Sequence, residues 1–82
     1  MTDIAIEYCA RCELAETATT VRRLVCERLR RDVPCERVSL SPSSDRTFRV
    51  MVDDEEIWSA DPDGRVDPVA ALNAIRYRLR AS

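Results

Sequence analysis

The feature that most constrains this chain is a pair of cysteines, Cys9 and Cys12, placed between two segments with different hydrophobic periods. Apolar and other residues alternate over residues 3–8, the pattern of a β-strand with one buried face. Over residues 13–31 the apolar residues instead recur along one stripe of a helix. We therefore expect both thiols in the loop between a strand and a helix. Free backbone N–H groups and the positive end of the helix dipole favour a thiolate there.

Three more strands are predicted, over residues 36–40, 47–52 and 55–59. Each has the alternating pattern of a strand with one buried face. Val33-Pro34 should end the first helix, because the residue before a proline is disfavoured in helical conformation. Residues 41–45 have the composition of a turn or loop.

A two-residue turn at residues 53–54 is predicted to join the third and fourth strands as a hairpin. Counting outward from this turn pairs Val50 with Ile57 and Arg49 with Trp58. This register places Ile57 on the apolar face of the sheet and Trp58 beside Arg49 on the opposite face. There, Trp58 could form a cation–π contact.

A last helix is predicted to run to about Arg80, because Asp67-Pro68 is typical of an N-cap followed by the first residue of a helix. The predicted order of elements is therefore β-α-β-β-β-α. All four strands alternate, so one sheet face should be open and both helices should cover the other. The fold class is therefore α/β, a two-layer sandwich with a four-stranded mixed sheet. We expect one domain over residues 1–82.

Composition excludes several classes of function. The chain contains no histidine and no lysine, so histidine-dependent catalysis, histidine-ligated metals and Schiff-base chemistry are excluded. Its formal net charge of −2 argues against a nucleic-acid-binding protein with a basic surface. No apolar run is long enough to span a membrane, and residues 1–3 do not resemble a signal peptide. We expect a cytoplasmic protein.

The CxxC pair has three interpretations. A strand, CxxC and helix in succession is the arrangement of a redox pair. Alternatively, Cys9 and Cys12 are simply small buried residues. A zinc site would need Cys26 and Cys35 as further ligands, and their spacing is not that of a second CxxC. We expect Cys26 to be a reduced, small hydrophobic residue in the helix. Cys35 should open the second strand as an inert thiol, although glutathionylation or a dimer disulfide are alternatives. No metal or cofactor is expected.

The chain resembles the Rdx family, the cysteine-containing relatives of selenoproteins W, T, V and H. The resemblance covers almost the whole chain. It rests on Ile-Glu-Tyr-Cys-x-x-Cys at residues 6–12, Val38-x-Leu40-x-Pro42, Phe48-x-Val50-x-Val52-Asp53, Glu56-Ile57-Trp58-Ser59, and a helix that begins at Pro68 and ends with Ile75-Arg76-x-x-Leu79. It implies a thioredoxin-like fold and a thiol redox role linked to glutathione or thioredoxin. It also implies that Cys9 and Cys12 are the redox pair, with Cys12 at the position of selenocysteine.

Two functions follow as hypotheses. In the first, the protein is a thiol–disulfide oxidoreductase that acts on protein thiols and disulfides. Cys12 attacks and Cys9 resolves, although the order in thioredoxins would name Cys9 as the attacker. In the second, the CxxC pair senses redox state and a protein partner docks on the open sheet face, at Arg49, Met51 and Trp58. We expect no nucleic-acid or membrane partner. A monomer is favoured.

Overall fold

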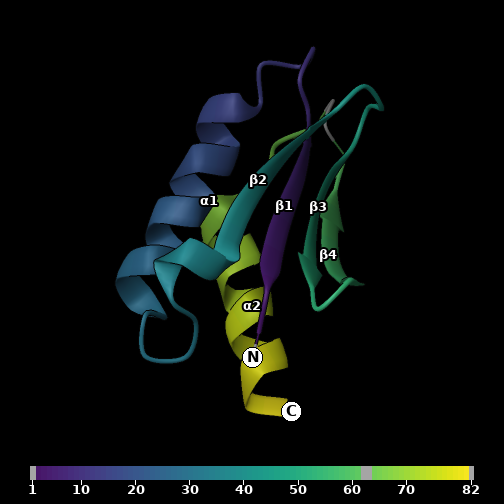
Figure 1. Ribbon diagram of the computed structural model, residues 1–82. Helices are drawn as coiled ribbons and strands as arrows, with labels where there is room; N and C mark the ends of the chain where they lie inside the picture. The colour runs from purple at the N-terminus through teal and green to yellow at the C-terminus, as the bar shows by residue number, and fades with distance from the viewer. Residues whose placement is uncertain (1, 62–63, 82) are drawn as a thin grey trace.

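The computed structural model describes residues 2–61 and 64–81, and Figure 1 shows their arrangement. Along the chain the elements are β1 (Ile4–Cys9), α1 (Ala15–Arg28), the short 3₁₀ helix η1 (Cys35–Arg37), β2 (Val38–Ser43), β3 (Phe48–Val52), β4 (Glu55–Ala60) and α2 (Pro68–Ala81). Apart from η1, the predicted order of strands and helices is confirmed.

The strands form one mixed sheet in the order β2-β1-β3-β4. β1 is parallel to β2 and antiparallel to β3, and β3 is antiparallel to β4. α1 packs on β1 and β2, α2 packs on β3 and β4, and the helices contact each other. As Figure 1 shows, both helices therefore cover one face of the sheet and leave the other open. The predicted two-layer, thioredoxin-like architecture is confirmed.

The core lies between the sheet and the helices. Alternate residues of the central strands point into it, as the period-2 pattern predicted. The fully or almost fully buried strand residues are Ile4, Ile6, Cys9, Val38, Phe48, Val50 and Val52. The helices contribute Ala18, Val21, Val25, Ala71, Leu72 and Ile75. Burying a large apolar side chain stabilises a fold by about 1.5–3 kcal/mol, so this layer holds the two helices against the sheet.

Two boundaries of α1 differ from the prediction of residues 13–31. The helix begins at Ala15, because Glu13 has a left-handed backbone with φ of 58° and cannot belong to a right-handed helix. It ends at Arg28, because the chain then turns to bury Val33. The amide of Val33 donates to the carbonyl of Leu29 at 2.9 Å in this turn.

The second strand also begins and ends later than predicted. Residues 35–37 form η1, and β2 continues through Ser41 and Pro42 to Ser43, where a loop was expected. Pro42 is tolerated because β2 is an edge strand that pairs only with β1 in this sheet. The last helix matches its prediction closely. The amide of Val69 donates to Oδ1 of Asp67 at 3.0 Å, as expected for an N-cap.

The hairpin between β3 and β4 has the predicted turn but a different register. Asp53 and Asp54 both have positive φ, 51° and 69°, as a two-residue type I′ turn requires. A β-bulge then makes Ile57 an extra residue, so Val50 pairs with Trp58. The predicted pairs Val50–Ile57 and Arg49–Trp58 are therefore wrong.

The bulge moves Trp58 to the helix-covered face of the sheet. Its ring packs edge-on against the fully buried Phe48, with ring centroids 6.1 Å apart and an interplanar angle of 89°. This T-shaped geometry is favourable for aromatic pairs. Trp58 therefore belongs to the packing of the domain and does not mark an open docking surface.

Candidate redox site

Cys9 and Cys12 lie together between β1 and α1, as the sequence predicted. The structure joins them in a disulfide with their Cα atoms 5.4 Å apart, inside the range that a disulfide requires. Cys9 is the last residue of β1, and Cys12 lies in the turn that leads to α1. The two sulfur atoms can therefore gain and lose a bond within one short loop.

The two cysteines differ in accessibility. Cys9 is fully buried, at 0% exposure, and Cys12 is half-buried. The amide of Cys9 donates to the carbonyl of Thr47 at 2.7 Å, which fixes the end of β1 to the start of β3. Cys12 instead lies in a turn whose next residue, Glu13, has left-handed backbone geometry. Solvent and other molecules therefore reach the pair from the side of Cys12.

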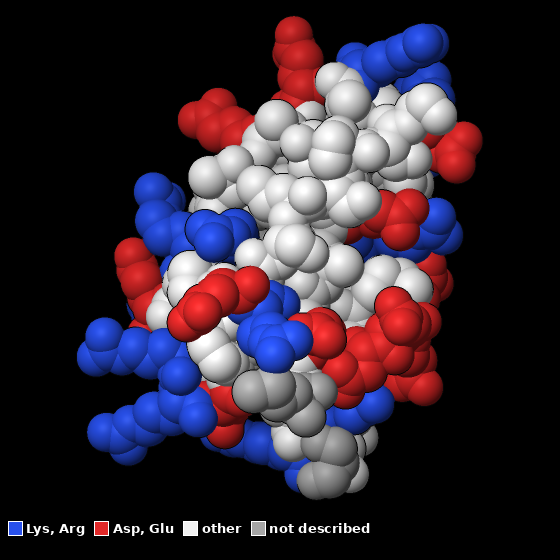
Figure 2. Space-filling view, in the orientation of Figure 1, with Lys and Arg blue, Asp and Glu red and all other residues white. Residues whose placement is uncertain are grey.

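The start of α1 lies directly after this turn. Leu14 occupies its N-cap position, and among the described residues no side chain caps this helix end. The first amides of a helix have no acceptor within the helix, so they favour negative charge nearby. In Figure 2 the upper middle of the face is mostly uncharged, while charged side chains gather below it and at the rim.

A second disulfide joins Cys26 and Cys35, whose Cα atoms are 4.9 Å apart. The prediction that Cys26 stays reduced and that Cys35 is an inert thiol is therefore wrong. α1 ends soon after Cys26, and the chain turns back so that Cys35 faces it from the start of η1. Among the described residues, no group of three or more potential ligands is placed so that it could hold a metal ion.

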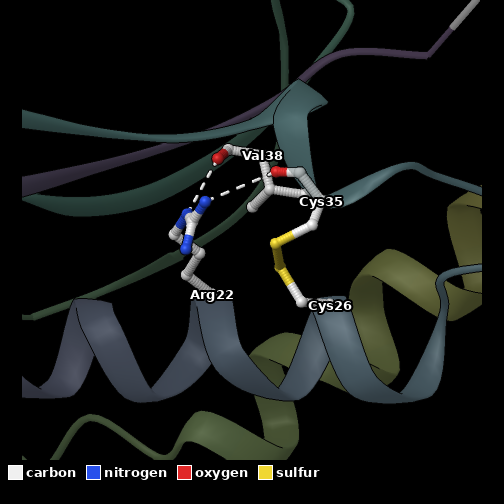
Figure 3. Close-up of a disulfide and its surroundings, with 4 residues drawn as sticks. All are labelled: Arg22, Cys26, Cys35 and Val38. Atoms are coloured by element: carbon white, nitrogen blue, oxygen red, sulfur yellow. Dashed lines mark hydrogen bonds between the residues drawn. A yellow bond between two sulfur atoms is a disulfide. The ribbon is translucent and has the colours of Figure 1, made fainter.

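Sequence reasoning also missed Arg22, which holds the segment next to this second bridge (Figure 3). Its Nε donates to the carbonyl of Val38 at 3.0 Å, and a terminal nitrogen donates to the carbonyl of Cys35 at 3.5 Å. The second bridge did have a signal in the sequence. The number of cysteines is even, and four cysteines can all be paired in three ways.

The open sheet face carries an ion-pair cluster in place of the predicted site around Trp58. Arg49 lies 2.9 Å from a carboxylate oxygen of Glu7 and 3.6 Å from one of Glu56. The hydrogen bond with Glu7, and then its charge, raise the pKa of the Arg49 guanidinium above its ordinary value. Three residues were predicted on this face. Arg49 and Met51 lie on it, whereas Trp58 lies on the helix-covered face.

A four-stranded mixed sheet covered on one face by two helices, with a CxxC pair in the first strand–helix loop, defines a thioredoxin-like protein. The chain belongs to the Rdx family, whose model matches residues 3–76. No curated protein matches it. Within the described residues, neither helix is long and apolar enough to cross a membrane.

Two solved structures resemble this one over nearly their whole length. A selenoprotein W-related protein from Vibrio cholerae has a TM-score of 0.78 and 18% sequence identity, covering 95% of this chain and 96% of its own. A protein from Bordetella parapertussis has a TM-score of 0.77 and 22% identity, covering 94% of this chain and 96% of its own. At these identities, the likeness establishes the fold. Family membership and the paired cysteines together support a redox role.

Proposed function

We propose that the protein is a thiol–disulfide oxidoreductase in which Cys12 attacks and Cys9 resolves. The observation that carries this proposal is the difference in burial between the two cysteines. Cys9 is fully buried at the end of β1, whereas Cys12 is half-buried in the adjoining turn. The attacking sulfur must be open to contact with a sulfur of the substrate disulfide. Of the two cysteines, only Cys12 offers such access.

The position of Cys12 before α1 adds a second argument. Helix N-termini stabilise thiolates and hold cysteine pKa values at about 3.5–7.5 in known redox proteins. Cys12 is closer than Cys9 to the uncapped start of α1. Accessibility and helix position therefore favour the same sulfur atom.

The reaction balances in two exchange steps. The Cys12 thiolate attacks one sulfur of a substrate disulfide, forms a mixed disulfide and releases the other sulfur as a thiolate. Cys9 then attacks the sulfur of Cys12 and forms the Cys9–Cys12 bond, and the second substrate sulfur leaves and takes the proton of Cys9. Two electrons pass to the substrate. A reductant of the glutathione or thioredoxin class restores the dithiol, and a cytoplasmic location would supply it.

The alternative function, a redox sensor that docks a partner on the open sheet face, loses its main support. It relied on Trp58 standing on that face, and Trp58 packs against Phe48 instead. The open face carries the ion pair between Arg49 and Glu7. We therefore favour thiol exchange at the CxxC pair over the sensor function.

The test compares Cys9→Ser and Cys12→Ser, each made in a Cys26→Ala/Cys35→Ala background so that only one reactive thiol remains. Alkylation rates are measured against pH. We expect the fast, low-pKa thiol in Cys9→Ser and slow alkylation in Cys12→Ser. The reverse result would show that Cys9 attacks, as in the thioredoxin order.

Turnover is measured separately, with insulin or glutathione disulfide as the substrate. We expect activity in the Cys26→Ala/Cys35→Ala protein and none after Cys12→Ser. A protein that exchanges more slowly than free dithiothreitol, yet captures a partner tightly, would contradict the oxidoreductase and support the sensor.

A further inference from the structure

The second disulfide lies in a segment that is held in place without it. The loop between Cys26 and Cys35 contains Leu29 and Val33, which are 4% and 0% exposed. Both side chains belong to the core, and the Val33 amide donates to the Leu29 carbonyl at 2.9 Å. Cleavage of the bridge would leave these contacts in place.

Arg22 forms a second, independent tether. Figure 3 shows Arg22 and Cys26 pointing from α1 toward the same segment. The guanidinium donates to the carbonyls of Val38 and Cys35, at 3.0 and 3.5 Å. With the sulfur bond broken, the two thiols would therefore still face each other and could close again. A disulfide with this property is reversible, since both thiols are preorganised.

Both cysteines of this bridge are partly exposed. Cys26 and Cys35 are half-buried and lie outside the buried core, unlike Cys9. Small thiols reach such positions, and exposed disulfides are the ones that exchange most readily. The bridge is therefore open to reduction in the folded protein.

The two cysteine pairs are far apart. They lie at opposite ends of α1, a helix of 14 residues that spans roughly 21 Å. A sulfur of one pair cannot reach a sulfur of the other in the folded chain. Electrons would have to travel between the pairs on an external thiol, so each pair is a site of its own.

The surroundings of the second pair are positively charged in an acidic protein. Residues 22–37 contain six arginines and three acidic residues, whereas the whole chain has a net charge of −2. In Figure 2 arginine side chains project from the lower left, where the end of α1 and the following loop lie. Such a region concentrates anions near it, most strongly at low salt.

We infer that Cys26 and Cys35 are a second thiol–disulfide exchange site, whose partner is a small thiol carrying carboxylates. One thiolate of the partner attacks one sulfur of the bridge and forms a mixed disulfide, and the other cysteine leaves as a thiolate and takes a proton. A second partner thiolate attacks the mixed disulfide. This step releases the partner as its own disulfide and leaves both cysteines reduced, with two electrons transferred to the protein.

The first experiment isolates the site in a Cys9→Ala/Cys12→Ala protein. The protein is equilibrated with reduced and oxidised glutathione at graded ratios, its thiols are trapped by alkylation, and the species are counted by mass. We expect one reversible two-electron transition, with the circular dichroism of the folded state unchanged throughout. Reduction that occurs only in denaturant would overturn the proposal, and so would a pair that never forms the bridge.

The second experiment tests the class of partner. The same protein is reduced with 3-mercaptopropionate, an anionic thiol, and with cysteamine, a cationic thiol. Each rate is divided by the rate at which that thiol reduces a neutral small disulfide. We expect the resulting ratio to be at least about threefold higher for the anionic thiol at low salt, and this difference should disappear as salt rises. In Arg30→Ser/Arg31→Ser, which removes two exposed charges, the preference should fall. Equal rates, or a preference for the cation, would overturn the assignment of an anionic partner.

Discussion

The stability that each disulfide contributes can be predicted from the length of chain that it closes. The Cys26–Cys35 bridge spans nine residues and the Cys9–Cys12 bridge spans three. A cross-link stabilises the fold by removing conformational entropy from the unfolded chain, and the effect grows with the logarithm of loop length. At 25 °C this loop entropy amounts to about 2.6 kcal/mol for nine residues and about 1.6 kcal/mol for three.

The assay uses two complementary variants. Cys9→Ala/Cys12→Ala retains only the nine-residue bridge, and Cys26→Ala/Cys35→Ala retains only the three-residue bridge. Each variant is unfolded in urea with and without a phosphine reductant, and the free energies of unfolding are subtracted. The direct effects of the alanines are common to both measurements and cancel, including any cavity at the buried Cys9. The difference therefore isolates the bridge.

We expect reduction to lower the free energy of unfolding by about 2.6 kcal/mol in the first variant and by about 1.6 kcal/mol in the second. A chain of this length has a total stability of about 4–12 kcal/mol, and each reduced variant lacks both bridges, which together amount to about 4.2 kcal/mol. A larger loss for the three-residue bridge than for the nine-residue bridge would refute the loop-entropy reasoning.

Three further outcomes are expected, each measured by urea unfolding. Trp58→Ala should lower the free energy of unfolding by about 2–3 kcal/mol, because it removes a half-buried ring from the core. The control Tyr77→Ala should change it by less than about 0.5 kcal/mol, because Tyr77 is 78% exposed. Similar losses in the two variants would contradict the bulged register. Asp54→Gly should raise stability by about 0.5 kcal/mol, because glycine accepts the positive φ of the turn without strain; a loss would contradict that turn geometry. Arg22→Ala should lower the free energy of unfolding by about 1–2 kcal/mol, because two hydrogen bonds are lost. The control Arg23→Ala, which changes the exposed neighbouring residue, should lower it by less than about 0.5 kcal/mol. Equal losses would argue against the tether.

The sequence predicted the layers of the fold because hydrophobic period depends only on local order along the chain. Residues such as Ile4, Ile6 and Val50 alternate with less buried neighbours, and the structure buries all three. The N-cap at Asp67 was predictable for the same reason, since both its donor and its acceptor are local. Features whose physical cause lies within a few residues are readable from the sequence.

The hairpin register was not predictable in this way. Ile57 and Trp58 are adjacent, both are apolar, and either could face the core next to Val50. One extra residue in β4, Ile57, decides the register, because a slip of one residue moves every later side chain to the other face. In the structure Trp58 pairs with Val50 and its ring reaches Phe48, while Ile57 also packs against the core as predicted. The deciding contact joins two strands and leaves no mark in the local pattern.

The second disulfide escaped prediction because it depends on where α1 ends. A helix that continued to residue 31 would carry the following chain away from Cys26. The observed helix ends at Arg28, and burial of Leu29 and Val33 turns the chain back toward Cys35. The alternating and helical patterns locate such a boundary only to within a few residues. Here, an error of three residues decided whether two thiols meet.

The CxxC site joins both kinds of information. Its place between a strand and a helix follows from local pattern, but the unequal burial of its thiols follows from tertiary packing. Cys9 ends β1 and is fully buried in the core, whereas Cys12 lies in the next turn and is only partly buried against that core. A central strand is not what buries a side chain in this sheet, since Val38 on the edge strand β2 is only 2% exposed. The difference in burial that supports attack at Cys12 therefore comes from contacts between elements, which the sequence pattern alone does not fix.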